Sequence, residues 1–254
     1  MKKIDLNSDM GEGFGVYSLG DDLGMLRIVT TANVACGFHA GDPEIMSTTF
    51  RAAREAGVAI GAHPGYPDLW GFGRRRLPFS TGEIIRFVAY QIGAAAAVAL
   101  VANHKITHVK IHGALGNLAE ENVEIAQALV EAVTSVDRGL SLFVIGGSIL
   151  DQAASRQGLP IVREIYADRA YLDTGQLMPR KLPGSVIHDA QLAGKRVLAM
   201  LQEGAIIAES GKRIPIQIDS VCVHGDTPNA VSIASTVRRG LETAGFTVRP
   251  YTAV

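Results

Sequence analysis

Short apolar runs alternate with longer helical patterns from one end of the chain to the other. A short apolar run rich in Val, Ile or Ala is typical of a strand that is buried on both faces. Such runs predict strands at 3–7, 31–36, 58–62, 107–112, 141–146, 160–167 and 219–224. The stretches between them predict helices near 43–56, 81–103, 121–136, 148–157, 188–204 and 228–244.

Local signals support several helix boundaries. Asp42 followed by Pro43 offers a cap and then proline at the first helical position. Ser80 and Glu83 have the spacing of a capping box, and Gly57 stands where a helix should end.

Repeated strand-then-helix units indicate the α/β class with a mostly parallel sheet. No linker rich in Pro, Ser or charge interrupts them, so we expect one domain over 1–254. An open, doubly wound sheet is the alternative. We favour a closed or nearly closed seven-stranded (β/α) barrel because of where the polar residues fall.

The composition of the chain limits the kinds of molecule that it could bind and the compartment that it suits. Of the 254 residues, 47% are hydrophobic and 19% are charged, against an average of about 25% charged. A formal net charge of −1 offers no basic excess for nucleic acid or for a membrane surface. The two cysteines cannot staple a chain of this size, which suits a reducing cytoplasm. The apolar stretch 92–102 is too short to span a bilayer, so we expect a buried helix there.

Polar, glycine-rich segments follow five of the predicted strands. Four of them contain histidine: GFHAGD (37–42), GAHPGYPD (61–68), KIHGALGN (110–117) and CVHGDTPN (222–229). The fifth is DLNSDMGE (5–12). In an α/β barrel the loops after the strands carry the active site, so these segments predict one site at one end of the barrel.

Strand alternation selects the side chains that point into this end. We expect one cavity lined by Asn7, Asp9, His39, His63, Lys110, His112 and His224. Asp5 shares the face of Asn7 but is interpreted as a structural group deep in the barrel. A buried Lys110 needs an anion partner, and we expect it to serve function rather than folding.

Two further segments have two interpretations each. Asp168 and Arg169 either reach a ligand from the loop after the sixth strand, near Glu164, or form a surface ion pair. The segment 71–76, which reads GFGRRR, either closes over an anionic substrate or is a solvated turn. Cys36 and Cys222 are interpreted as small buried hydrophobes rather than metal ligands.

Several familiar motifs are absent from the sequence. It contains no G-x-x-x-x-G-K-[ST], no Cys-x-x-Cys and no His-Glu-x-x-His, and the glycines at 11, 13 and 15 depart from G-x-G-x-x-G. We therefore expect no dedicated nucleotide site in this chain. His104, His108 and His112 lie too far apart along a strand to bind one metal together.

The strings DLNSDMGEGFG, NVACGFHAGDP, GAHPGYPD, KIHGALGN, YADRAYLDTGQLMPR and VCVHGDTPNA resemble the LamB/YcsF family of 5-oxoprolinase A subunits. The resemblance covers essentially the whole chain. It implies an irregular seven-stranded (β/α) barrel like that of the glycoside hydrolase/deacetylase group. It also implies a bacterial cytoplasmic protein that, with partner subunits B and C, opens the lactam of 5-oxoproline to L-glutamate with ATP and Mg.

The family pattern KPHGALYN differs here at Ile111 and Gly116, which leaves the size of the substrate open. Deacetylases of similar fold hold a divalent ion with one Asp and two His. Asp9, His39 and His63 could supply such a set, with His112 nearby, although the His-x-x-x-His spacing of those enzymes is missing.

The residues suggest roles for a lactam-opening site. We expect catalytic roles for Asp9, His39, His63, Lys110, His112 and Asp226, and substrate binding by Asn7, Glu12, Arg169 and His224. His and Asp side chains are suitable acids and bases, and Lys110 and Arg169 could hold a carboxylate or an oxyanion. The rival hypotheses are a stand-alone metal-dependent hydrolase or deacetylase and a non-catalytic binding protein within the complex.

Overall fold

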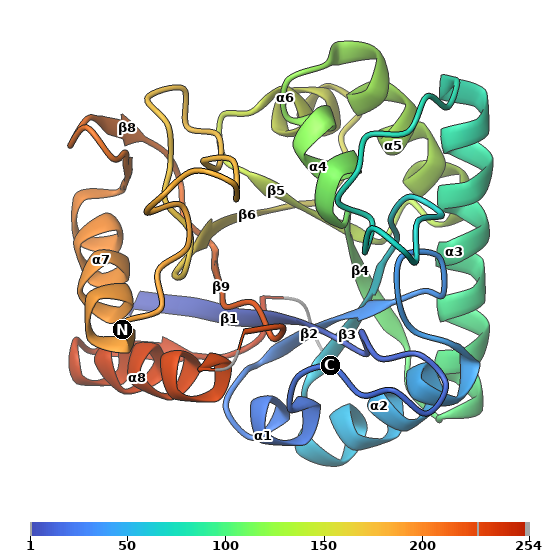
Figure 1. The fold of residues 1–254 in the computed structure, drawn as a ribbon, viewed down its shortest axis with the longest axis horizontal. Coiled ribbons are helices and arrows are strands. Elements are labelled where there is room, and N and C mark those ends of the chain that lie inside the picture. Colours follow the sequence, from blue (N-terminus) through green and yellow to red (C-terminus); the bar gives the residue numbers. More distant parts are fainter. Residues whose placement is uncertain (1, 228, 252–254) are drawn as a thin grey trace.

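The computed structural model, which describes residues 2–227 and 229–251, is built on a closed parallel barrel surrounded by helices (Figure 1). The barrel strands are β1 (Lys2–Met10), β2 (Thr31–Ala35), β3 (Ala59–His63), β4 (Ile106–Lys110), β5 (Ser141–Ile145), β6 (Ile161–Tyr166) and β9 (Ser220–Cys222). All seven predicted strands are present.

The barrel closes because β1 pairs with two strands. Asn7 of β1 lies opposite Thr31 of β2, and Asp5 of β1 lies opposite Ser220 of β9. Both pairings are parallel. The expectation of a closed barrel rather than an open sheet is confirmed. Strands buried on both faces explain why the apolar runs lack the alternation of a half-exposed sheet.

Helices cover the outside of the barrel (Figure 1). Six of them match the prediction: α2 (Pro43–Ala56), α3 (Thr81–Val101), α5 (Val123–Val136), α6 (Ile149–Arg156), α7 (Ala190–Glu203) and α8 (Ala230–Thr243). The Asp42 side chain accepts from the amides of Glu44 and Ile45, and Ser80 and Glu83 form the predicted capping box. Pro228, the predicted start of the last helix, lies outside the described residues.

Other elements were not predicted. They are α1 (Asp22–Leu26), α4 (Gly113–Ala119), the antiparallel pair β7 (Ala205–Ile207) and β8 (Arg213–Pro215), and β10 (Phe246–Val248), which pairs with the start of β1. The strand predicted to reach 112 ends at Lys110, because His112 is the N-cap of α4. His112 therefore leaves the strand and turns back over the barrel mouth.

Helix α3 differs from the buried helix that the sequence suggested. It is long and apolar enough to cross a membrane by length and composition, yet only 33% of its most apolar window is buried within the chain. One face packs against the barrel side through Ile84, Val88 and Ile92, while Tyr90 and Val101 are exposed. The helix thus has one buried face and one apolar exposed face.

Asp5 anchors the lower part of the barrel, as its position suggested. Its carboxylate accepts hydrogen bonds from the hydroxyls of Thr30, Thr31 and Ser220. Burial raises the pKa of Asp5 to about 6, against the lowering effect of these three hydroxyls. The side chain links β1, β2 and β9 where the barrel closes.

Candidate functional site

One cavity of about 510 Å³ opens at the carboxyl ends of the barrel strands. Six of the ten residues expected at the site line it: Asp9, His63, Lys110, His112, Arg169 and His224. The other four, Asn7, Glu12, His39 and Asp226, are not among the residues that line it. The expectation that Asn7 and His39 line the cavity is therefore corrected, although both contact residues that do.

Lys110 lies between two carboxylates at the end of β4. Its ammonium is 3.0 Å from Asp9 Oδ1 and 3.1 Å from Glu164 Oε2, and it also lies 3.0 Å from Cys222 Sγ. Burial alone would lower the pKa of Lys110, but Asp9, Cys222 and Glu164 outweigh it and raise that pKa well above its ordinary value. Burial would likewise raise the pKa of Asp9, but His63 and Lys110 hold it well below its usual range. Because these contacts use its donors, Lys110 is a structural cation as well as a site residue.

A fully buried amide layer supports Lys110 from below. Asn7 donates to Glu164 Oε2 and to Ser220 Oγ, and its own Oδ1 accepts from Asn33. Asn33 also donates to Asp9 Oδ1 at 2.9 Å. This network occupies the Asn7 amide, so in the structure Asn7 orients the Glu164 carboxylate beside Lys110.

The imidazole rings of His63 and His112 point unprotonated nitrogens at each other. His63 Nδ1 lies 2.7 Å from the carbonyl oxygen of Lys110, and His112 Nε2 lies 2.8 Å from that of Phe72. Because a carbonyl can only accept, these nitrogens carry the protons. The unprotonated His63 Nε2 and His112 Nδ1 are then 3.0 Å apart. Such an arrangement needs a cation or a proton between the two rings.

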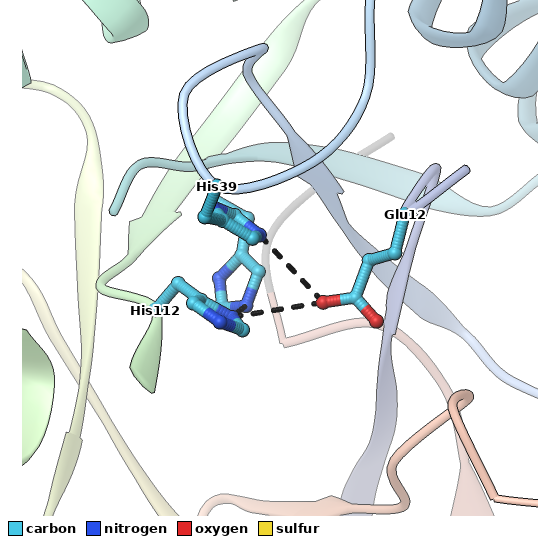
Figure 2. Close-up of side chains that lie close together, drawn as sticks. Glu12, His39 and His112 are labelled. Atoms are coloured by element: carbon cyan, nitrogen blue, oxygen red, sulfur yellow. Dashed lines mark hydrogen bonds and ion pairs between the residues drawn. The ribbon is translucent and has the colours of Figure 1, made fainter. Parts of the chain in front are cut away.

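Glu12 and His39 complete this group, which we call the histidine cluster: Glu12, His39, His63 and His112. Figure 2 shows the Glu12 carboxylate approaching His39 and His112, with Oε1 at 3.7 Å from His39 Nε2 and 3.6 Å from His112 Nδ1. One ligand atom from each of the four residues lies within 4.8 Å of the others, and neither ring nitrogen of His39 has a hydrogen-bond partner among the described residues.

This donor set fits a divalent metal ion. Three imidazoles and a carboxylate suit zinc and other first-row divalent ions, and the unpartnered nitrogens of His39 agree with such a site. Burial, and then the neighbouring imidazoles, lower the pKa of His39 and His112, so both rings are neutral and able to bind. The carboxylate whose oxygen lies within 4.8 Å of all three imidazole nitrogens is that of Glu12, whereas the sequence suggested Asp9, whose Oδ2 lies 3.4 Å from His63 Nε2.

His224 is paired with a buried carboxylate. Its Nδ1 lies 2.9 and 3.0 Å from the two oxygens of Asp168. Burial would raise the pKa of Asp168, but His224 lowers it below its usual value. Nδ1 therefore donates to Asp168, and Nε2 is left for the cavity that His224 lines. The alternative of a surface ion pair between Asp168 and Arg169 is wrong, since both are buried and Asp168 bonds to His224.

The segment 71–76 lies over the histidine cluster. A Cβ built on Gly73 would lie 2.8 Å from both His39 and His112. Arg74 reaches across to Asp226 Oδ2 at 2.6 Å, joining this loop to the one after β9. Asp226, for which we expected a catalytic role, is thus an anchor for Arg74 in the structure. The position of segment 71–76 over the histidine cluster agrees with a lid, and the ion pair between Arg74 and Asp226 fixes the segment there.

The loop between β6 and α7, residues 167–189, forms another wall. It supplies Arg169, Arg180 and Lys181, while α4 supplies Gly116 beside Ile111. Gly116 therefore lies on the cavity wall, where the family pattern has tyrosine. Sequence reasoning missed Arg180, Lys181 and Glu120 as cavity residues. Arg180 ends one of the strings that resemble the family, but the long loop and the short helix that position these residues have no periodic pattern that would place them at the cavity.

The fold and the cavity define an α/β barrel of the deacetylase type, with its site at the carboxyl ends of the strands. The catalytic domain of a peptidoglycan N-acetylglucosamine deacetylase from Eubacterium rectale shares the fold, with a TM-score of 0.54 at 12% identity over 99% of this chain and 89% of that one.

The chain belongs to the LamB/YcsF family, whose model matches residues 4–254. It is 54% identical over 251 residues to the 5-oxoprolinase A subunit of Gluconobacter oxydans, covering 99% of each chain. It also resembles the crystal structure of the lactam utilization protein of Thermus thermophilus. That match has a TM-score of 0.92 and 43% identity, and covers 98% of this chain and 100% of that one.

Proposed function

We propose that this chain is the lactam-opening component of an ATP-dependent 5-oxoprolinase that works in the cytoplasm with partner subunits B and C. The names of its close relatives support this proposal. The observation that carries it is a single cavity in which a carboxylate-bound histidine, His224, lies with His63, His112 and several cationic side chains. Such a cavity suits a small anionic substrate whose cleavage needs proton transfer.

The chemistry divides between this chain and its partners. The sequence has no phosphate-binding loop of the G-x-x-x-x-G-K-[ST] type, so we assign ATP and Mg to the partner subunits. Transfer of the terminal phosphoryl group to the lactam oxygen makes the ring carbon electrophilic. Water adds to that carbon, the carbon–nitrogen bond breaks as nitrogen takes a proton, and a second water releases phosphate and L-glutamate.

In this mechanism the residues of the chain hold and move protons. Nε2 of His224, oriented by Asp168, accepts a proton from the attacking water and returns one to the ring nitrogen. Arg169 holds the substrate carboxylate, and Lys110 keeps Asp9 ionised beside His63. The histidine cluster would hold a divalent ion, which supplies Lewis-acid polarisation of an oxygen.

The test is reconstitution. We expect 5-oxoproline-dependent ATP hydrolysis and glutamate release when this chain is added to its partners, and neither when it is withheld. His224→Gln in the assembled enzyme should lower glutamate release at least about 100-fold. Unchanged turnover in His224→Gln would limit the chain to binding, without a chemical role.

A second candidate is a stand-alone metal-dependent hydrolase, which the histidine cluster and the deacetylase-type fold favour. The pure chain, loaded with zinc and given 5-oxoproline without ATP, distinguishes the two. Glutamate formed at the rate of the full complex would support the stand-alone enzyme.

A further inference from the structure

Three cations at the cavity lack a carboxylate partner. Arg169, Arg180 and Lys181 all line it from the loop between β6 and α7. The described part of the chain offers none of them an ion pair. Arg169 instead donates to the backbone carbonyls of Ser185 and Met178, which fix its guanidinium in place.

The remaining cations of the cavity are already paired. Lys110 is held by Asp9 and Glu164. Arg74 pairs with Asp226, and Arg76 pairs with Glu121. The cations without an ion pair are therefore concentrated on one wall, the long loop that follows β6, where the nearby Asp168 carboxylate offsets part of their charge.

The pKa of Arg169 reflects the positive charges that lie close together on this wall. Only 4% of its surface is exposed, and burial, followed by the nearby charge of Arg180, lowers its pKa to about 10. Arg180 is half-buried and Lys181 is exposed. A buried guanidinium such as that of Arg169, with a second cation nearby, is costly unless an anion joins them. Arginine also suits phosphate oxygens, because its planar fork binds two of them at once.

The charge of the wall exceeds what the free lactam offers. 5-Oxoproline has one carboxylate, which one guanidinium neutralises. A phosphoryl group adds about 1.5 to 2 negative charges near neutral pH. The carboxylate and the phosphoryl group together match the three unpaired cations.

We propose that Arg169, Arg180 and Lys181 form a phosphoryl-recognition wall, so that the cavity takes the phosphorylated lactam rather than free 5-oxoproline. This inference rests on the proposed function, in which the partners phosphorylate the lactam. The wall retains the activated substrate beside His224 and keeps it from escaping to bulk water. ATP itself is a rival source of phosphate, and the missing phosphate loop argues against it.

The first experiment measures binding to the full chain by calorimetry. The probe is proline carrying a 5-phosphonate, a stable mimic of the phosphorylated ring, compared with 5-oxoproline and with ATP. We expect the phosphonate to bind at least about tenfold tighter than 5-oxoproline, and Arg180→Gln to remove that advantage. Arg239→Gln, the same change at an exposed position of α8 away from the cavity, is the matched control.

Two results of this experiment would contradict the proposal that the wall recognises a phosphoryl group. One is equal affinity for the phosphonate and 5-oxoproline. The other is ATP binding more tightly than the phosphonate and losing the most in Arg180→Gln, which would identify a nucleotide site. Lys181→Gln, at an exposed position, provides the same comparison if Arg180→Gln does not fold.

The second experiment measures coupling in the assembled enzyme. With Arg180→Gln we expect ATP hydrolysis to continue while the glutamate formed per ATP falls severalfold, because the activated lactam is lost before ring opening. A wild-type coupling ratio in the variant contradicts the wall. If the wild-type assembly shows no 5-oxoproline-dependent ATP hydrolysis, the proposed function fails, and the binding experiment still decides whether the wall recognises a phosphoryl group.

Discussion

Lys110 keeps two carboxylates together that would otherwise repel each other inside the barrel. The sequence suggested that it serves function with little effect on folding, but its contacts with Asp9 and Glu164 show a buried ion-pair network. Removing one partner of such a network leaves uncompensated charge. The structural role therefore has to be tested together with the functional one.

We predict that Lys110→Met lowers the free energy of unfolding by about 3–5 kcal/mol, measured by urea denaturation. Lys212→Met, at an exposed lysine bonded to the carbonyl of Asp173, should change it by less than about 0.5 kcal/mol. Adding Glu164→Gln to Lys110→Met should restore part of the loss. A loss below about 1 kcal/mol in Lys110→Met would contradict the structural role.

A substitution at Gly65 would perturb the histidine cluster without changing any of its four residues. A Cβ at this position would lie 2.8 Å from His39 Nδ1 and 3.2 Å from His112 Cβ, so alanine must displace the rings. We predict that Gly65→Ala weakens zinc binding at least about tenfold, measured by competition with a chromophoric chelator.

Gly93 is the matched control for this change. It lies in α3, where an added Cβ meets nothing within 4 Å. Gly93→Ala should leave zinc affinity unchanged and stabilise the helix by up to about 1 kcal/mol. Equal zinc affinity in Gly65→Ala and the wild type would show that the cluster does not bind the ion.

At the scale of elements, α4 ends in a half-buried acid whose Oε2 is enclosed. Glu120 is its C-cap, and its Oε2 has no hydrogen-bond partner among the described residues. Burial raises the pKa of Glu120 to about 8. In the unfolded chain this carboxyl loses its proton near pH 4.5, whereas the folded chain keeps the proton until about pH 8. Its contribution to stability is therefore greatest below pH 4.5 and falls as the pH rises to 8.

We predict that Glu120→Gln removes this dependence. The difference in unfolding free energy between the variant and the wild type should be small near pH 5 and should favour the variant at pH 8.5. Denaturant titrations at both pH values measure it, and the other titrating groups cancel in the difference. Parallel pH profiles for the two proteins would contradict the raised pKa.

The sequence predicted the elements with strong periodicity and failed where local preference is weak. All barrel strands and the six long helices were expected, because buried runs and caps mark them. Helix α4 was missed since it begins at Gly113 and contains Gly116, and glycine disfavours helix. The strand ends were enough to predict that the site residues converge, but not which side chains bond to each other. That Asp168 binds His224 and that Glu12 joins the histidines depend on loop paths that no periodicity encodes.

At the scale of the whole molecule, the face that bears the cavity also bears exposed apolar side chains. Val16 and Trp70, in loops that follow β1 and β3, are 93% and 98% exposed. The loops at the opposite end of the barrel supply no cavity residues among those the structure describes. Under the proposed function an activated substrate passes between subunits, and docking over the mouth then limits its loss to water by keeping the path short.

We predict that adding the partner subunits slows amide hydrogen exchange in residues 11–21, 64–76 and 168–189. Residues 103–105 and 137–140, at the other end of the barrel, serve as the internal control and should exchange as before. Protection found only in the control segments would place the docking surface at the opposite end of the barrel.

The pairing of β1 with both β2 and β9 has a consequence for how the chain is made. During synthesis β1 emerges before the other barrel strands, and one of its two partners in the barrel, β9, follows only after more than 200 further residues. Until then the edge of β1 is unpaired, and an unpaired edge is a template for association with other chains. Contacts of such long sequence separation also form slowly. The nascent chain is therefore exposed to association until β9 has been made, and the ring of strands closes only when that strand pairs with β1.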